Sequence, residues 1–425
     1  MTPSPLEPRS DLRFVPSVPV ALGMAILAGW IMDFGFPDRD IWPLALLGLL
    51  LMLWSVRGLS LRRSLLVGAV GGFTFFGILI WWLTVYLGLI PWIALTLAQV
   101  FFFALGMGLV GLAWHYGSRQ WPGLAGRLVI TPALVGGAWM TSEAVSSVFP
   151  FGGFAWARIS QSQSESTLAP LVAWVGTSGM SFVLAFFVAF LLALVTERRI
   201  AWDAKATLAW ATALALVIWP AWPVTESGSI RVLAVQGNAE AGLFADYDWG
   251  DNLADHYRVT KPLYGQDVDV VIWPENASDV DPLRYPDAAA VVSEVSREMG
   301  APLVVGTITR DGAETFNSML MWEFDEASGR DIVRDQYDKI HPVPFAEYLP
   351  WRSFFYPLAP SLFSMVPRDY SFGQRDTVFD VAGATAGIAI CFDIVDDEIV
   401  WAMMDSGAEI IFAPTNNADF GRTDQ

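Results

Sequence analysis

The chain has 425 residues, of which 54% are hydrophobic and only 16% are charged, and its mean hydropathy is +0.44. This composition excludes an ordinary water-soluble globule. The formal net charge of -18 disfavours a nucleic-acid partner, because such a partner needs a basic face. The single cysteine, Cys391, excludes an internal disulfide framework and a zinc site built on two or more thiolates.

Continuous apolar stretches fill the first half of the chain. Stretches of this length cross roughly 30 Å of hydrocarbon as helices. They cover residues 14–36, 41–56, 64–87, 89–114, 128–145, 168–195 and 206–224. The second is short, and the third and fourth are nearly continuous. The sequence therefore predicts a transmembrane domain of about seven helices over residues 1–228.

Basic residues are distributed unevenly between the two sets of loops that connect these stretches. The set of loops on one side holds only two basic residues, Arg39 and Arg158. The set on the other side holds ten, which are Arg9, Arg13, Arg57, Arg62, Arg63, Arg119, Arg127, Arg198, Arg199 and Lys205. Lys and Arg are retained on the cytoplasmic side. We therefore expect a multi-pass protein of the bacterial inner membrane with a cytoplasmic N-terminus. Seven crossings would place the second half of the chain on the outer, periplasmic face.

Two glycine patterns in the apolar half have an alternative interpretation. The run from Gly106 to Gly111 fits the dinucleotide-binding fingerprint, but no strand precedes it and no acidic residue follows at the spacing that ribose binding needs. Gly68 and Gly72 have the spacing of close helix contacts. We interpret both patterns as helix packing and expect no cofactor.

A non-apolar segment at the predicted outer side, SSVFPFGGFAWARISQSQSES at 146–166, combines aromatic residues, glycines and one arginine. Two interpretations fit this composition. The segment is either an entry region for a lipid headgroup or acyl chain, or an interfacial loop with a belt of aromatic residues.

After Ser229 the pattern changes to short apolar runs separated by polar helical stretches. The runs are IRVLAVQGN, VDVVIWPEN, APLVVGTIT, NSMLMWEF, TAGIAICFD and AEIIFAPTN. Strands that are buried on both faces and alternate with helices indicate an α/β layered fold. We therefore predict a second, water-soluble domain over residues 229–425, with functional side chains at the ends of its strands.

Two candidates for catalysis in this domain are charged residues, and each also has an ordinary explanation. Glu275 follows the apolar run 268–273 and Pro274, where partial burial raises the pKa of a carboxyl group toward that of a useful base. A surface or helix-capping glutamate is the alternative. Lys339 lies in a loop rich in proline and aromatic residues, the kind of element that holds functional groups. A surface charge is the alternative there.

The third candidate is Cys391, which follows the apolar run 387–390 at a predicted strand-to-helix junction. A thiol at such a turn is ionised by a nearby ammonium group and by the amides of a helix N-terminus, which makes it a nucleophile. The alternative is a small buried core residue, which is the usual environment of a free cysteine.

The order of Glu, Lys and Cys resembles the catalytic triad of the nitrilase superfamily. The likeness extends over WPEN at 273–276, YDKIHPVPFAEYLP at 337–350, GIAICFD at 387–393 and PTNNADFGRTDQ at 414–425. The apolar stretches and FPFGGFAWARISQSQ at 149–163 are similar to the apolipoprotein N-acyltransferase family. This resemblance implies a polytopic α-helical membrane domain followed by an α/β nitrilase-like domain, an αββα sandwich, with Glu275, Lys339 and Cys391 as its catalytic residues.

The same resemblance implies further site residues. Glu347, in the lysine loop, and Asp393, two residues after the cysteine, match acidic positions that assist the triad, although the family most often has Glu at the latter position. Residues within these motifs that are predicted to contact substrate are Phe392, Asn416, Asn417 and Trp273. The three histidines have no metal-ligand spacing, so we expect no metal.

The implied reaction moves an acyl chain from a phospholipid to the amino group of diacylglyceryl-cysteine on an apolipoprotein, through a thioester on Cys391. We expect a monomer. The chain stops at Gln425, before the remaining elements of a nitrilase domain, so we expect a domain that is incomplete at its C-terminus. Two alternatives are a membrane-tethered nitrilase-type amidase, with water as acceptor, and a truncated, inactive scaffold.

Overall fold

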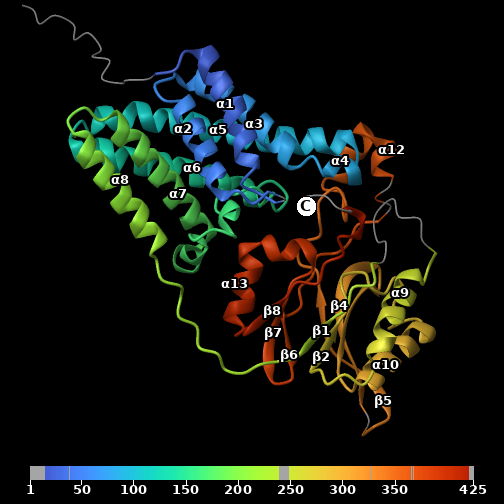
Figure 1. Cartoon of the computed structure of the whole chain (residues 1–425). Coiled ribbons are helices and arrows are strands. Elements are labelled where there is room, and N and C mark those ends of the chain that lie inside the picture. Colours follow the sequence, from blue (N-terminus) through green and yellow to red (C-terminus); the bar gives the residue numbers. More distant parts are fainter. Residues whose placement is uncertain are drawn as a thin grey trace, which may run out of the picture. The chain divides into compact units, whose positions relative to one another are not determined.

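The structure is a computed structural model that describes residues 15–37, 39–238, 248–325, 327–364, 366 and 368–420. The chain divides into two compact units between Val224 and Thr225 (Figure 1). The first unit is helical, and the strands lie in the second. The sequence predicts this division after residue 228, and that boundary stays a prediction.

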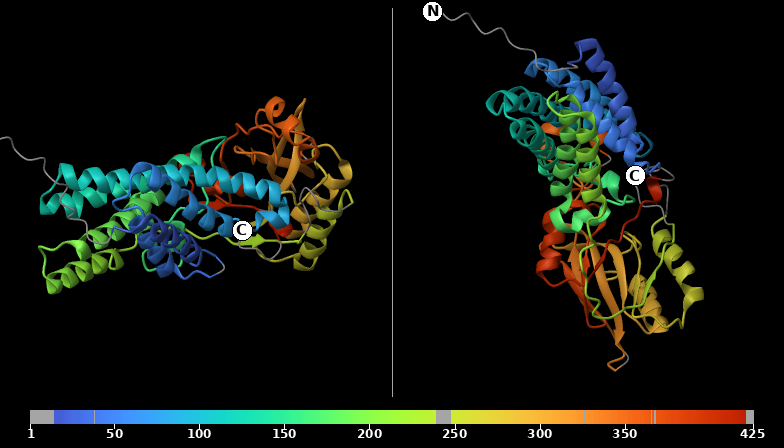
Figure 2. Two further views of the ribbon diagram at one scale, coloured as in Figure 1. Left: turned by 90° about the horizontal axis from the view of Figure 1, so that it is seen from above. Right: turned by 60° about the vertical axis from the view of Figure 1, so that its left-hand side comes forward.

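The helical unit contains the apolar stretches of the first half (Figure 2). Its helices are α1 (Val18–Asp33), α2 (Trp42–Ser55), α3 (Leu61–Leu79), α4 (Leu83–Tyr86), α5 (Leu89–Gln120), α6 (Thr131–Val148), α7 (Val172–Thr196) and α8 (Trp202–Val217). A π-helical turn lies at Gly126–Ile130, and 3-10 turns lie at Gln161–Gln163 and Ala169–Leu171.

Among the described residues, four helical segments are long and apolar enough to cross a membrane. They are Leu61–Leu79, Leu89–Gln120, Gly126–Val148 and Ala169–Thr196. Helices α1 and α2 are apolar but shorter, and α8 has 16 residues with Asp203 in its first turn. The prediction of one continuous helix over 64–87 is wrong, because α3 ends at Leu79 and α4 begins only at Leu83. The total number of crossings stays a prediction.

Small residues bring these helices close together. A Cβ atom added to Gly68 of α3 would lie 2.6 Å from the Cβ atom of Met107 on α5. One added to Gly106 of α5 would overlap the side chain of Ser142 on α6. Larger residues at these positions would force the helices apart. The interpretation of the glycine patterns as helix packing is therefore confirmed.

The segment between α6 and α7 has its own polar core. Arg158 is 5% exposed, and its guanidinium group donates to Ser147 Oγ and to Thr177 Oγ1, each at 2.8 Å. The Glu143 carboxylate accepts from the backbone N–H of Ile159 at 2.9 Å and from the indole N–H of Trp139 at 2.7 Å. The one arginine of this segment is therefore occupied within the fold, which favours the interpretation as a structured interfacial loop over a headgroup-binding arginine.

The described residues of the second unit form two sheets. The larger one has the order β1 (Val232–Ala234), β2 (Val270–Ile272), β3 (Leu303–Asp311), β4 (Glu314–Asp325) and β5 (Arg330–Asp338). Strands β1 to β3 are parallel, and β3 to β5 are antiparallel. The smaller sheet has the order β6 (Val378–Val381), β7 (Ala384–Ile388) and β8 (Ile410–Phe412), with β6 antiparallel and β8 parallel to β7.

Helices cover the outer faces of both sheets. Helices α9 (Asp251–Thr260) and α10 (Pro286–Met299) pack on the larger sheet, and α13 (Asp397–Asp405) packs on the smaller one. Between the sheets, Ile272 and Met319 share an apolar cluster with Phe379 and Ile388. The order of layers is helix, sheet, sheet, helix, so the predicted αββα sandwich is confirmed. Shorter helices are Lys261–Leu263, Arg352–Phe355, Tyr356–Leu358, Pro360–Phe363, Cys391–Val395 and Ala418–Phe420.

Two strands, β5 and β6, were not predicted from the sequence. Strand β5 has the sequence RDIVRDQYD, and its first five residues are exposed, so it lacks the apolar run by which the other strands were recognised. It forms because it pairs with β4 over most of its length, apart from a register shift between Met321 and Trp322, and this pairing satisfies the backbone groups that face β4. The predicted loop that holds Lys339 therefore begins only after Asp338, since Tyr337 and Asp338 end this strand.

Candidate active site

The ends of three strands bring the candidate catalytic residues together. Glu275 comes shortly after β2, Lys339 directly follows β5, and Cys391 opens the 3-10 helix that follows β7. Strand β5 runs in the same direction as β2, because two antiparallel pairings separate it from β3, which is parallel to β2. The carboxyl ends of β2 and β5 therefore lie at the same edge of the sheet.

Lys339 lies between two carboxylates. Its Nζ atom is 3.2 Å from Glu275 Oε1 and 2.9 Å from Glu347 Oε2, and its side chain is only 1% exposed. Burial lowers the pKa of Lys339, but the charges of Glu275 and Glu347 outweigh burial, so that its pKa is raised well above the ordinary value. Lys339 is therefore a buried cation, and the alternative of a surface charge is excluded.

Glu347 also holds the lysine loop in shape. Its Oε2 atom accepts from the backbone N–H of Val343 at 2.6 Å, and its backbone carbonyl accepts from the N–H of Tyr370 at 2.9 Å. The carboxylate thus folds back on its own loop while it contacts the lysine. This arrangement agrees with the assisting role that the sequence resemblance implies for Glu347, and that role stays a prediction.

Asn317, on β4, is a site residue that the sequence interpretation missed. Its Nδ2 atom donates to Glu275 Oε1 at 2.7 Å and to Glu347 Oε1 at 3.0 Å, and its backbone carbonyl accepts from the N–H of Lys339 at 2.8 Å. A signal was present, because Asn317 alternates with Met319 and Met321 along β4 and shares their buried face. A polar residue on such a face must find hydrogen-bond partners.

Cys391 has a backbone φ of 51°, in the left-handed region that residues other than glycine rarely adopt. Its N–H donates to the carbonyl of Pro414 at 3.2 Å, which fixes the turn against the end of β8. Burial, and then the charge of Glu275, raise the pKa of Cys391 well above its ordinary value, and Lys339 opposes them only in part. The raised pKa favours the neutral thiol over the thiolate, so Cys391 needs a base to become a nucleophile, and the expectation that a nearby ammonium group ionises it stays a prediction.

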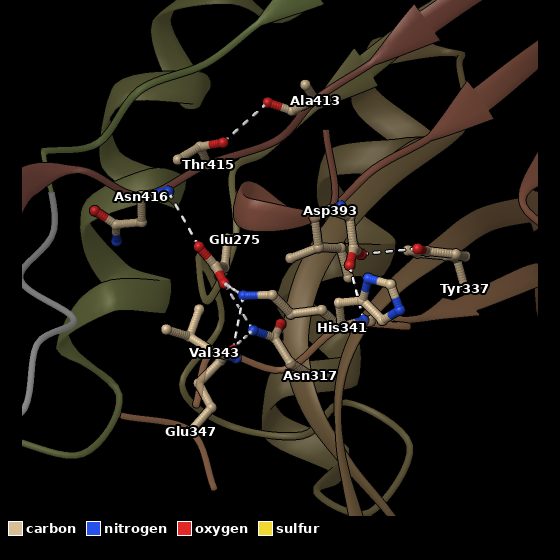
Figure 3. Close-up of polar contacts among 12 residues, drawn as sticks. Glu275, Asn317, Tyr337, His341, Val343, Glu347, Asp393, Ala413, Thr415 and Asn416 are labelled. Atoms are coloured by element: carbon tan, nitrogen blue, oxygen red, sulfur yellow. Dashed lines mark hydrogen bonds and ion pairs between the residues drawn. The ribbon is translucent and has the colours of Figure 1, made fainter. Parts of the chain in front are cut away.

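Asp393 ties the lysine loop to the cysteine turn. It is fully buried, and its carboxylate accepts from the hydroxyl of Tyr337 at 2.8 Å and from the backbone N–H of His341 at 2.9 Å (Figure 3). A third contact comes from the backbone N–H of Ile390 at 3.3 Å. Asp393 therefore connects the end of β5, the residues after Lys339 and the residue before Cys391.

Two glycines let backbone segments approach the site. A Cβ atom on Gly306 of β3 would collide with the carbonyl of Pro274 and would lie 2.8 Å from the Cα atom of Glu275. A Cβ atom on Gly373 would collide with the carbonyl of Asp338, the residue before Lys339. The N–H of Gly373 donates to the carbonyl of Lys339 at 2.8 Å. The positions of Glu275 and Lys339 therefore depend on these neighbours having no side chain.

The four predicted substrate contacts lie in different environments. Trp273 is fully buried in the core under α9, and its indole N–H donates to Thr260 Oγ1 at 3.0 Å, which favours a packing role over a substrate contact. Asn416 is 7% exposed, and its backbone N–H lies 3.5 Å from Glu275 Oε2. Phe392 is partly exposed beside the nucleophile, and Asn417 is exposed. Within the described ranges, no group of three or more His, Cys, Asp or Glu residues could hold a metal ion.

A pH-dependent contribution to stability is expected from His341. Its Nδ1 atom lies 2.8 Å from Asp396 Oδ2, and this hydrogen bond raises the pKa of His341 although burial opposes it. A raised pKa in the folded state stabilises the fold below the unfolded pKa, and this stabilisation is lost as the pH rises through the folded pKa. We expect H341N to lower the melting temperature more at about pH 5.5 than at about pH 9.

D396N should also lower the melting temperature more at low pH than at high pH, because either substitution removes the pair of His341 and Asp396. Melting curves of the solubilised protein across this pH range provide the measurement. Equal losses of melting temperature at both ends of the range would contradict the prediction.

Two family models match the chain. One, described as Apolipoprotein N-acyltransferase N-terminal domain, matches residues 28–191, and one, described as Carbon-nitrogen hydrolase, matches residues 191–423. The apolipoprotein N-acyltransferase of Mycolicibacterium smegmatis is 30% identical over 94% of this chain and 70% of that protein. The chain belongs to the apolipoprotein N-acyltransferase family. The relative of that name from Pseudomonas putida is 27% identical over 94% of this chain and 79% of the relative.

Solved structures of the carbon-nitrogen hydrolase superfamily are also similar to this member of the apolipoprotein N-acyltransferase family. A superfamily protein from Xanthomonas campestris is 20% identical, with a TM-score of 0.25 over 39% of this chain and 54% of that chain. An amidase from Nesterenkonia sp. AN1 is 16% identical, with a TM-score of 0.32 over 44% of this chain and 67% of that chain. The sequence-based prediction of the family is confirmed by the family models and the relatives.

Proposed function

We propose that this family member transfers an acyl chain from a phospholipid to the amino group of diacylglyceryl-cysteine on apolipoproteins, with Glu275, Lys339 and Cys391 as its catalytic residues. The observation that supports the proposal most is the buried Lys339 cation, 3.2 Å from Glu275 and 2.9 Å from Glu347. Burying such charges is costly unless their geometry is excellent, and clusters of this kind are frequent at functional sites.

In the first half of the reaction, the Cys391 sulfur attacks the ester carbonyl carbon of the phospholipid while Glu275 takes the thiol proton. The S–H bond breaks, and O–H and C–S bonds form. Lys339 and the backbone N–H of Phe392 stabilise the negative charge on the carbonyl oxygen. The C–O ester bond then breaks, and the leaving alkoxide takes the proton from Glu275. The products are a lysophospholipid and a thioester on Cys391.

In the second half, the amino nitrogen of the lipoprotein attacks the thioester carbonyl carbon. Glu275 takes a proton from this nitrogen, a C–N bond forms, and the C–S bond breaks. The proton then passes to the cysteine thiolate, which restores the neutral thiol of the resting site. The kinetics should be ping-pong, because the first product leaves before the second substrate reacts.

We also propose that the N-terminus is cytoplasmic, that the second unit faces the periplasm and that the protein acts as a monomer. The distribution of basic residues supports the orientation, although Arg9 and Arg13 lie outside the described residues. The monomer is supported by the site, since the described residues of one chain supply Glu275, Lys339 and Cys391. Apolar helices in the same chain would hold the enzyme in the bilayer, where both lipid substrates reside.

The transferase proposal is tested with membranes that contain the protein, a phospholipid labelled in its acyl chain and a synthetic diacylglyceryl-cysteine peptide. We expect the label to appear in the peptide as an amide. A peptide with an acetylated N-terminus is the control and should stay unlabelled, because it lacks the attacking amine. Label that appears only as free fatty acid would overturn the proposal in favour of an amidase-type hydrolase that uses water. Label that stays in the phospholipid would favour an inactive scaffold.

A further inference from the structure

The amide group of Asn317 joins the two carboxylates of the site. Its Nδ2 atom has two N–H groups, and the contacts to Glu275 Oε1 at 2.7 Å and to Glu347 Oε1 at 3.0 Å use both. Asn317 is 1% exposed, and within the described part of the chain its Oδ1 atom has no hydrogen-bond partner. The opposite orientation would turn that oxygen toward two carboxylates, so the carboxylates fix the direction of the amide.

These contacts make the two oxygens of Glu275 unequal. Oε1 accepts from Asn317 at 2.7 Å and from Lys339 at 3.2 Å. Oε2 accepts from the backbone N–H of Asn416 at the longer distance of 3.5 Å. Oε1 is therefore occupied by two donors that hold the carboxyl group in place, whereas Oε2 keeps most of its capacity to accept a proton.

Resting on the proposed function, we propose that Asn317 is a positioning residue that holds Glu275 with its Oε2 atom available for the Cys391 proton. When the thiol is activated, the S–H bond breaks and the proton binds to Glu275 Oε2. Asn317 does not touch the reacting atoms and acts through Glu275. Because a thiol reacts as its thiolate, a correctly oriented base decides whether Cys391 reacts near neutral pH.

The test measures the alkylation of Cys391 by iodoacetamide in the full solubilised chain, as a function of pH. Cys391 is the single cysteine, so intact mass reports one site. N317L keeps the size of the side chain and removes both donors. We expect N317L to slow alkylation near neutral pH by on the order of tenfold to a hundredfold, because a hydrogen bond to a charged group is lost. The midpoint of its pH profile should move to higher pH.

N317S serves as a second variant that keeps one donor, and its rate should lie between those of N317L and the parent protein. M319L is the matched control, because Met319 shares a face of β4 with Asn317 and the substitution conserves volume. It should leave the pH profile of alkylation unchanged. Parental pH profiles in both N317L and N317S would overturn the inference, since a purely structural residue would change stability and not the pH at which the thiol reacts.

Alkylation needs neither acyl donor nor acceptor, so this test separates the inference from the proposed function. A parent protein that transfers no acyl chain, but whose alkylation responds to N317L as expected, would overturn the function and support the positioning role. A parent protein that transfers acyl chains, but whose alkylation ignores N317L and N317S, would overturn the positioning role alone.

Discussion

Substituting Cys391 by serine is expected to abolish acyl transfer, with a loss on the order of a thousandfold or more. A serine hydroxyl gives up its proton far less readily than a thiol, and the proposed base, Glu275, would have to remove that proton. Intact mass spectrometry after incubation with a phospholipid should show an acyl adduct on the parent protein and none on C391S.

A double variant provides the matched control for this prediction. Ser406 is exposed at the C-terminal end of α13, so C391S/S406C keeps one thiol in the chain but places it away from Glu275. It should form no acyl adduct, because a thiol without the base is not activated. Full transfer activity in C391S would remove Cys391 as the nucleophile, and an adduct on S406C would show that acylation does not need the site.

The order of residues along the chain was sufficient to propose Glu275, Lys339 and Cys391 as one site. Each lies in a short motif at the end of an apolar run, and the three motifs together are much more specific than any one of them. The protonation of the site could not be predicted in this way. It depends on the two carboxylates that surround one lysine, and Glu347 comes within 2.9 Å of Lys339 only because its loop folds back on itself.

Asn317 and β5 show where the sequence pattern was insufficient. Strand β5 is charged and exposed over most of its length, and it exists because β4 offers a partner for its backbone. Asn317 was visible as the first residue of a strand-like run, but its role requires knowledge that β4 lies beside β5 and places this amide next to Glu275. Both features follow from pairing between segments, which the local composition does not reveal.

Replacing Lys339 is expected to lower both stability and acyl transfer strongly, because of the charges that surround it. Glu275, Glu347 and Lys339 are buried together, and one ammonium group neutralises part of the repulsion between two carboxylates. Removing one partner of a buried pair leaves an uncompensated charge, which costs about 3–5 kcal/mol. We therefore expect K339M to lower the free energy of unfolding by about this amount and to abolish acyl transfer. Thermal unfolding of the solubilised protein gives the first quantity.

K261M is the matched control for K339M. Lys261 lies on the surface, so its replacement should change the free energy of unfolding by no more than about 0.5 kcal/mol.

The double variant K339M/E347Q separates stability from catalysis, since neutralising Glu347 relieves the repulsion that K339M creates. It should recover part of the lost stability and none of the activity, because no cation remains to stabilise the oxyanion. Recovery of both, or an unchanged stability in K339M, would show that Lys339 does not hold the two carboxylates together.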